Sequence, residues 1–98
     1  MNEMNEHKNF IKARLDRRTL LEQLAEEAAE LSQAALKCIR AEKMSDNSTP
    51  VPLEDAVWNL NEEVYDVLAV AELLNLVPDG TTVNNPKWKR WAMRIADK

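Results

Sequence analysis

Two long helical stretches carry apolar residues at alternating steps of four and three positions, and each interrupts the pattern with a glutamate. In the first stretch the pattern consists of Leu20, Leu24, Glu27, Leu31, Ala34 and Cys38. In the second it consists of Ala56, Leu60, Glu63, Val67, Val70 and Leu74. Side chains at this spacing form one seam along a helix, and such a seam packs against a partner helix. The sequence therefore predicts two paired helices with a carboxylate inside each seam.

The composition is typical of an all-α protein. Of the 98 residues, 45% are hydrophobic and 31% are charged, whereas aromatic residues make up 5% and glycine occurs once. Ala, Leu, Glu, Lys and Arg favour helices over strands and turns. We expect residues 1–98 to form a single all-α domain, a four-helix bundle built on an antiparallel central helix hairpin.

Capping residues indicate where the first two helices begin and end. After frayed residues 1–6, a weaker apolar pattern predicts a helix over about residues 7–16. The segment Thr19–Glu22 is typical of a capping box, in which the threonine hydroxyl and the glutamate carboxylate satisfy free amides. It predicts a second helix that ends near Met44, although the first helix could also continue straight into it.

Turn-forming residues separate the second helix from the third. Residues 45–52 are rich in Ser, Asn and Pro and form a loop. The third helix begins either just after Thr49, with a proline in its first position, or at Pro52, and it ends near Leu76. A further Asn-Pro pair opens a fourth helix over about residues 86–96.

Each seam glutamate has a second carboxylate one turn further on, Glu30 after Glu27 and Asp66 after Glu63. Helices joined by a short loop pack antiparallel. Because each residue adds about 1.5 Å along a helix, the two pairs of carboxylates then lie at nearly the same height along the hairpin. No Lys or Arg lies within four positions of either seam glutamate, so no ion pair along the helix neutralises them. The alternative interpretation is that these four acids lie on helix faces exposed to solvent.

Four carboxylates that face one interior need a counter-charge, because their mutual repulsion opposes ionisation. A hard divalent cation prefers oxygen ligands, so the pattern predicts a Mg²⁺ site, for which Mn²⁺ is a possible substitute.

The remaining bulk properties narrow the choice of partners. The net charge of −4 gives no general attraction to nucleic acid or to an anionic membrane. Cys38 is the only cysteine, so we expect a small buried thiol and no disulfide within the chain. No signal peptide or membrane-spanning segment is visible, and we expect a cytoplasmic protein.

The acidic segments resemble motifs of a known family. Residues Glu26–Glu30 read EEAAE and residues Glu63–Asp66 read EVYD, which together are similar to the EExxE and ExxD motifs of the MazG-like all-α nucleoside triphosphate pyrophosphohydrolases. The resemblance covers about residues 17–76. It implies a MazG-type helical hydrolase that assembles as a homodimer or homotetramer. It also implies Mg²⁺-dependent conversion of a nucleoside triphosphate to the monophosphate and pyrophosphate, as in house-cleaning of the nucleotide pool.

The resemblance also assigns roles by position. Glu27, Glu30, Glu63 and Asp66 would be metal ligands, and Glu26 would be an accessory acid or the residue that orients the attacking water. All five would be catalytic. The related phosphoribosyl-ATP pyrophosphohydrolases are an alternative, but the histidine that usually follows their second motif is missing here. A non-catalytic helical module for oligomerisation or interaction is the alternative from another functional class.

Basic and aromatic residues outside the motifs are candidates for substrate binding. Lys37 and Arg40 follow Glu30 by two to three turns and could hold the outer phosphates, or they could belong to a solvated face. Trp58 could stack on a base, or lie in the core or at a subunit interface. In the fourth helix, Arg90 and Arg94 share one face and could bind a triphosphate or contact another subunit. Two tryptophans, Trp88 and Trp91, lie between its basic residues.

Overall fold

The computed structural model describes residues 2–43, 52–76 and 85–97, which form four helices and no strand. In chain order these are α1 (Glu3–Arg14), α2 (Arg17–Ala41), α3 (Leu53–Leu73) and α4 (Asn85–Ala96). This confirms the all-α class. None of the helices in these ranges combines the length and the apolar character that crossing a membrane requires.

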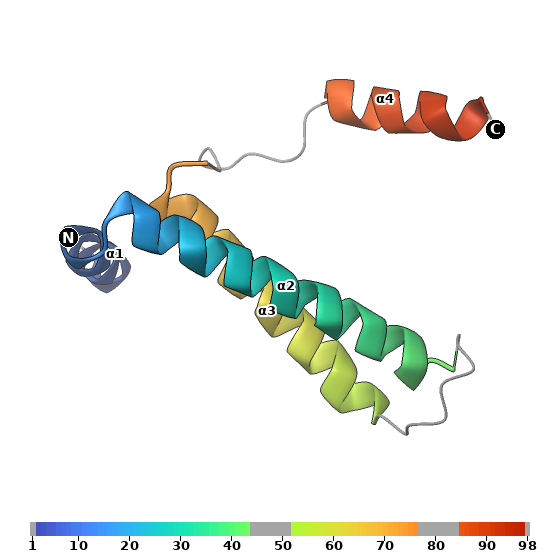
Figure 1. The fold of residues 1–98 in the computed structure, drawn as a ribbon, viewed down its shortest axis with the longest axis horizontal. Helices are drawn as coiled ribbons and strands as arrows, with labels where there is room; N and C mark the ends of the chain where they lie inside the picture. The colour runs from blue at the N-terminus through green and yellow to red at the C-terminus, as the bar shows by residue number, and fades with distance from the viewer. Residues whose placement is uncertain (1, 44–51, 77–84, 98) are drawn as a thin grey trace.

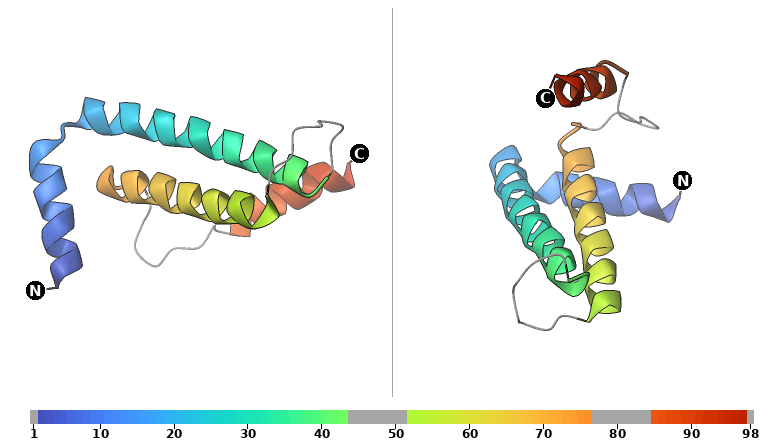
Figure 2. Two further views of the ribbon diagram at one scale, coloured as in Figure 1. Left: turned by 90° about the horizontal axis from the view of Figure 1, so that it is seen from below. Right: turned by 90° about the vertical axis from the view of Figure 1, so that its right-hand side faces the viewer.

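α2 and α3 pack side by side in opposite directions and form the centre of the structure (Figures 1 and 2). Every position of the two expected seams is buried or half-buried. The buried positions are Leu20, Ala34 and Cys38 in α2, followed by Ala56, Val70 and Leu74 in and just after α3. The pairing of the helices through these seams is therefore confirmed.

The two ends of the hairpin are packed by side chains of different size. Leu20, Val70 and Leu74 form a cluster at the end where α2 begins. At the opposite end the buried residues are small, and the Cys38 thiol donates a hydrogen bond to the backbone carbonyl of Ala56 over 3.4 Å. Cys38 is therefore a buried free thiol, as expected. The seam glutamates lie between these two apolar ends.

α1 begins earlier than expected. The Asn2 side chain accepts a hydrogen bond of 2.8 Å from the amide of Asn5 and caps a helix that starts at Glu3. The prediction that residues 1–6 are frayed is therefore wrong for the residues from Glu3 onward. α1 has no buried residue. It meets the end of α3 through polar contacts, in which Lys8 pairs with Glu72 and the Lys12 ammonium donates to the Asn75 side chain over 3.4 Å.

The break between α1 and α2 lies where the sequence suggested it, but its cap is different. Asp16, with an extended backbone, accepts a hydrogen bond of 2.8 Å from the amide of Thr19. This bond lowers the pKa of the Asp16 carboxyl. Thr19 is already helical, and Glu22 pairs with Arg18 over 3.0 Å. The predicted capping box over Thr19–Glu22 is therefore wrong, because the aspartate three residues earlier already satisfies the Thr19 amide.

We expect Asp16→Ala to lower the melting temperature more than Thr19→Ala does, since Thr19→Ala removes only the weaker, side-chain bond to Asp16. The first substitution leaves an amide of the first turn of α2 without its acceptor. Thermal unfolding followed by circular dichroism, at one protein concentration, compares the two variants. A larger fall in melting temperature for Thr19→Ala than for Asp16→Ala would support the capping box at Thr19 instead.

The other helix ends differ from expectation by a few residues. α3 begins directly after Pro52, in agreement with the second of the two expected starts. It ends at Leu73, three residues before Leu76, and Asn75 has a left-handed backbone with φ of 60°. α2 ends at Ala41, earlier than the expected end near Met44, and it also begins earlier than the expected cap at Thr19; Met44 and Thr49 lie outside the described residues.

α4 lies apart from the hairpin (Figure 1). Its side chains from Pro86 onward are exposed, and extensive packing between described helices is confined to α2 and α3. Apart from α4, the described part of the chain is a two-helix hairpin with α1 across one end.

Candidate metal centre

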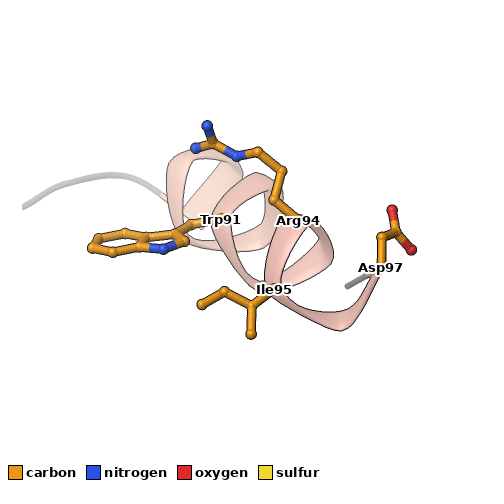
Figure 3. Close-up of a pocket in the computed structure, with 4 residues that line it drawn as sticks. All are labelled: Trp91, Arg94, Ile95 and Asp97. Atoms are coloured by element: carbon orange, nitrogen blue, oxygen red, sulfur yellow. The ribbon is translucent and has the colours of Figure 1, made fainter.

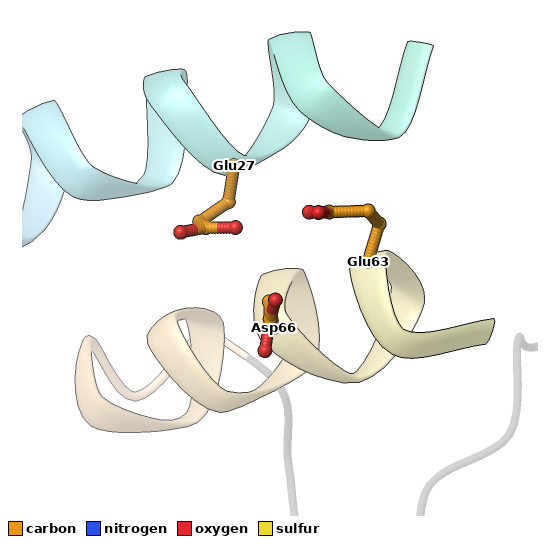
Figure 4. Close-up of side chains that lie close together, drawn as sticks. All are labelled: Glu27, Glu63 and Asp66. Atoms are coloured by element: carbon orange, nitrogen blue, oxygen red, sulfur yellow. The ribbon is translucent and has the colours of Figure 1, made fainter. Parts of the chain in front are cut away.

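Three of the predicted acidic residues meet in the middle of the hairpin. Glu27 of α2 and Glu63 and Asp66 of α3 each contribute a carboxylate oxygen, and these oxygens lie within 4.8 Å of one another. Figure 4 shows the Glu27 and Glu63 side chains pointing toward each other across the gap between the helices, with Asp66 on the next turn of α3. We call Glu27, Glu63 and Asp66 the carboxylate cluster.

Two oxygens of the cluster are buried without a hydrogen-bond partner, Glu27 Oε2 and Glu63 Oε2. The other Glu27 oxygen, Oε1, accepts a hydrogen bond of 2.8 Å from the side-chain amide of Gln23. In the described parts of the chain, the ion pairs involve other acids and leave the cluster without a cationic side chain. A carboxylate oxygen that is buried without a partner lowers the stability of the folded protein. The cluster therefore has acceptor oxygens that no side chain satisfies.

The surroundings raise the pKa of Glu63 above its ordinary value of 4.5. Burial is the main cause, because it disfavours the charged form. The hydrogen bond that a protonated Glu63 can donate to Glu27 also raises the pKa, as do the negative charges of Glu30, Glu27 and Asp66. The folded protein therefore binds a proton at Glu63 more tightly than the unfolded chain does.

The cluster fits a hard divalent cation. All of its donor atoms are carboxylate oxygens, which Mg²⁺ and Mn²⁺ prefer, and the two orphaned oxygens face no other partner. Asp66 is exposed whereas Glu27 and Glu63 are half-buried, so the cluster is open on one side. A ligand can therefore approach from solvent.

Two acids of the expected site lie outside the cluster. Glu30 is exposed and does not converge with the three oxygens, yet it is close enough for its charge to raise the pKa of Glu63. Glu26 is exposed on α2 and is also outside the cluster.

The predicted phosphate-binding residues of α2 are further away. Lys37 is exposed, and Arg40 is half-buried with its Nε buried and unpartnered among the described residues. Arg40 follows Glu27 by thirteen positions, which is about 20 Å along the helix. These two side chains are therefore not part of the cluster.

Trp58 lies five positions before Glu63 and is 66% exposed. The expectation of a core role for Trp58 is therefore wrong within the single chain, because its ring projects into solvent. The suggestions that it stacks on a base or belongs to a subunit interface stay predictions.

The predicted arginines of α4 are exposed. Arg94 lines a pocket with Trp91, Ile95 and Asp97, and Figure 3 shows its guanidinium on a different side of the helix from the Trp91 and Ile95 side chains. Arg90 and Arg94 also line a second pocket on α4. Both pockets lie on α4 and not beside the carboxylate cluster.

Gln23 is a residue of the site that the motifs do not include. Its side-chain amide holds one oxygen of Glu27 and so fixes the orientation of that carboxylate. The spacing in the sequence could have identified Gln23, because a glutamine four positions before a glutamate lies on the same helix face.

Comparisons of the chain with protein-family models, with curated proteins and with solved structures found no match.

Proposed function

We propose that the protein is a Mg²⁺-dependent nucleoside triphosphate pyrophosphohydrolase of the MazG-like type, which releases a nucleoside monophosphate and pyrophosphate. The observation that carries the proposal is the convergence of Glu27, Glu63 and Asp66 from two helices, with two buried oxygens left unpaired. These are three of the four positions that the EExxE and ExxD motifs assign to metal ligands. Solvated acidic faces do not account for this convergence, because two of the acids occupy apolar seams.

The residues of the cluster have distinct parts in this proposal. Glu27, Glu63 and Asp66 would hold the cation, and Gln23 keeps Glu27 aimed into the cluster. When bound, the cation would neutralise charge on the phosphate oxygens and lower the pKa of a bound water. Glu30 is exposed and acts on Glu63 through its charge, so it is better placed than Glu26 to accept a proton from the attacking water.

Phosphate binding in this proposal uses cationic side chains. Lys37, Arg40, Arg90 and Arg94 are the candidates, and Trp58 is the candidate for stacking on the base. No glycine-rich phosphate loop is available, because the chain has one glycine.

The proposed assembly is a homodimer or homotetramer, in which hairpins from different copies complete a MazG-type four-helix bundle. It is supported by the apolar side chains that the single chain leaves exposed on α2 and α3, such as Leu21, Ile39, Val57, Val64 and Leu68. Apolar side chains that stay exposed along a helix face are typical of an interface. The same observation also favours the second candidate function, a non-catalytic oligomerisation module.

Pyrophosphate release distinguishes the two functions. We expect at least one member of a panel of canonical and modified nucleoside triphosphates to yield monophosphate and pyrophosphate in equal amounts. The release should require Mg²⁺ or Mn²⁺ and should stop with a chelator. Nucleoside diphosphates serve as the control, since they cannot release pyrophosphate by this cleavage. A panel that shows no release at any metal concentration would favour the non-catalytic module.

A further inference from the structure

α4 is a basic amphipathic helix with an exposed apolar face. Trp88, Trp91 and Ile95 lie at positions i, i+3 and i+7 on one face, and they are 53%, 56% and 64% exposed. The two tryptophan rings stack with centroids 6.1 Å apart. Arg90 and Arg94 lie on the other side, and α4 contains four cationic residues and no acidic one. Such a helix combines apolar and electrostatic attraction for an acidic partner.

α3 has the opposite charge and its own exposed aromatic residues. It contains no Lys or Arg, and its acids are Glu54, Asp55, Glu62, Glu63, Asp66 and Glu72. Glu54, Trp58, Glu62 and Tyr65 follow one another at steps of four, four and three, so they lie along one helix face. We call these four residues the α3 ridge. Its two aromatic rings are 66% and 69% exposed, and its two acids are exposed as well.

We propose that α4 of one copy docks on the α3 ridge of a second copy. Charge complementarity favours this partner, since α4 carries four cationic residues and no acid, whereas glutamates alternate with the aromatic rings of the ridge. The lengths also match: the ridge spans eleven positions, about 17 Å, and the twelve residues of α4 span about 18 Å.

A second copy is the better partner than the same chain, because α4 lies apart from its own hairpin (Figure 1). Each copy offers one α4 and one ridge. Two copies can therefore exchange their fourth helices symmetrically, so that the same contact forms twice. The inference rests on the proposed assembly of the chain. It uses Arg90, Arg94 and Trp58 for contact between copies, so it is tested by the mass of the assembly and not by activity.

Charge reversal on both surfaces tests the docking in the full chain. We expect Arg90→Glu with Arg94→Glu to raise the dissociation constant of the assembly by about tenfold or more, and Glu54→Lys with Glu62→Lys to do the same. Mixing the two variants should restore assembly, because each then meets opposite charge on the other copy. Sedimentation velocity over a concentration series measures the mass in each case. Arg17→Glu with Lys43→Glu, both exposed, is the control with the same change in net charge as the α4 variant.

Each other outcome overturns the docking. A monomeric wild type at all concentrations would do so, as would equal weakening by the control variant. A mixture that stays dissociated would place α4 on its own hairpin. Binding to phosphatidylserine vesicles by a protein that remains monomeric would make α4 a membrane-surface helix. Because mass is the readout, failure here is distinct from a failure to release pyrophosphate.

Discussion

Glu63→Gln should reduce Mg²⁺-dependent pyrophosphate release by about 100-fold or more, in line with the loss of a preorganised charged group at a reacting centre. The substitution keeps the shape of the side chain but removes a charge from the carboxylate cluster, where the oxygens of Glu27, Glu63 and Asp66 lie within 4.8 Å of one another. Affinity for a divalent cation falls with the charge of its ligands. Initial rates at several Mg²⁺ concentrations measure the effect.

Asp55→Asn is the matched control for this experiment. Asp55 lies in the first turn of the same helix and is exposed, and the substitution likewise converts an acid to its amide. We expect the control to keep activity close to that of the wild type. Equal loss in both variants would indicate a general effect of charge, and full activity of Glu63→Gln would remove Glu63 from the catalytic assignment. Circular dichroism establishes that the helices are retained in each.

The second large effect concerns stability without metal. In buffer with a chelator, we expect Glu63→Leu to raise the melting temperature by about 5 °C, the shift that about 1 kcal/mol of added stability produces in a chain of this size. A leucine continues the apolar seam, whereas Glu63 leaves one oxygen buried and unpartnered. Replacing unpaired buried charge by apolar groups is often stabilising. Differential scanning calorimetry at one protein concentration measures the shift.

The pH dependence of this shift follows from the raised pKa of Glu63. The native state binds the proton more tightly than the unfolded chain, so stability falls as the pH rises through a window that begins at 4.5 and extends upward. The difference in melting temperature between Glu63→Leu and the wild type should therefore be largest at neutral pH. The gap should narrow as the pH falls toward 4.5, because Glu63 of the folded protein takes up its proton above that pH. A gap that is constant from neutral pH down to 4.5 would contradict this account.

Adding Mg²⁺ should reverse the order of the two proteins. A ligand that binds the native state raises its stability, so we expect the melting temperature of the wild type to rise with Mg²⁺ concentration and that of Glu63→Leu to remain unchanged. Asp55→Leu serves as the control and should keep the response to Mg²⁺. A wild type that does not respond to Mg²⁺ or Mn²⁺ would exclude the cluster as a site for these ions.

Much of the hairpin could be predicted from periodicity. The twelve seam positions are all buried or half-buried. Residues at alternating steps of four and three lie on one face of a helix, and a partner helix buries that face. The level at which Glu27 meets Glu63 could also be predicted, since the rise per residue is nearly constant. Periodicity does not identify capping residues, which is why Asp16 and not Thr19 caps α2.

By itself, the sequence determined that two helices pair through their seams and that each brings a glutamate to the same level. It did so because helix rise and helix phase depend on the local backbone alone. Only the tertiary structure decided which second carboxylate joins them. Glu30 and Asp66 each follow a seam glutamate by three positions, yet only Asp66 converges with the pair. The rotation of each helix about its own axis decides this, and that rotation is set by packing between the helices.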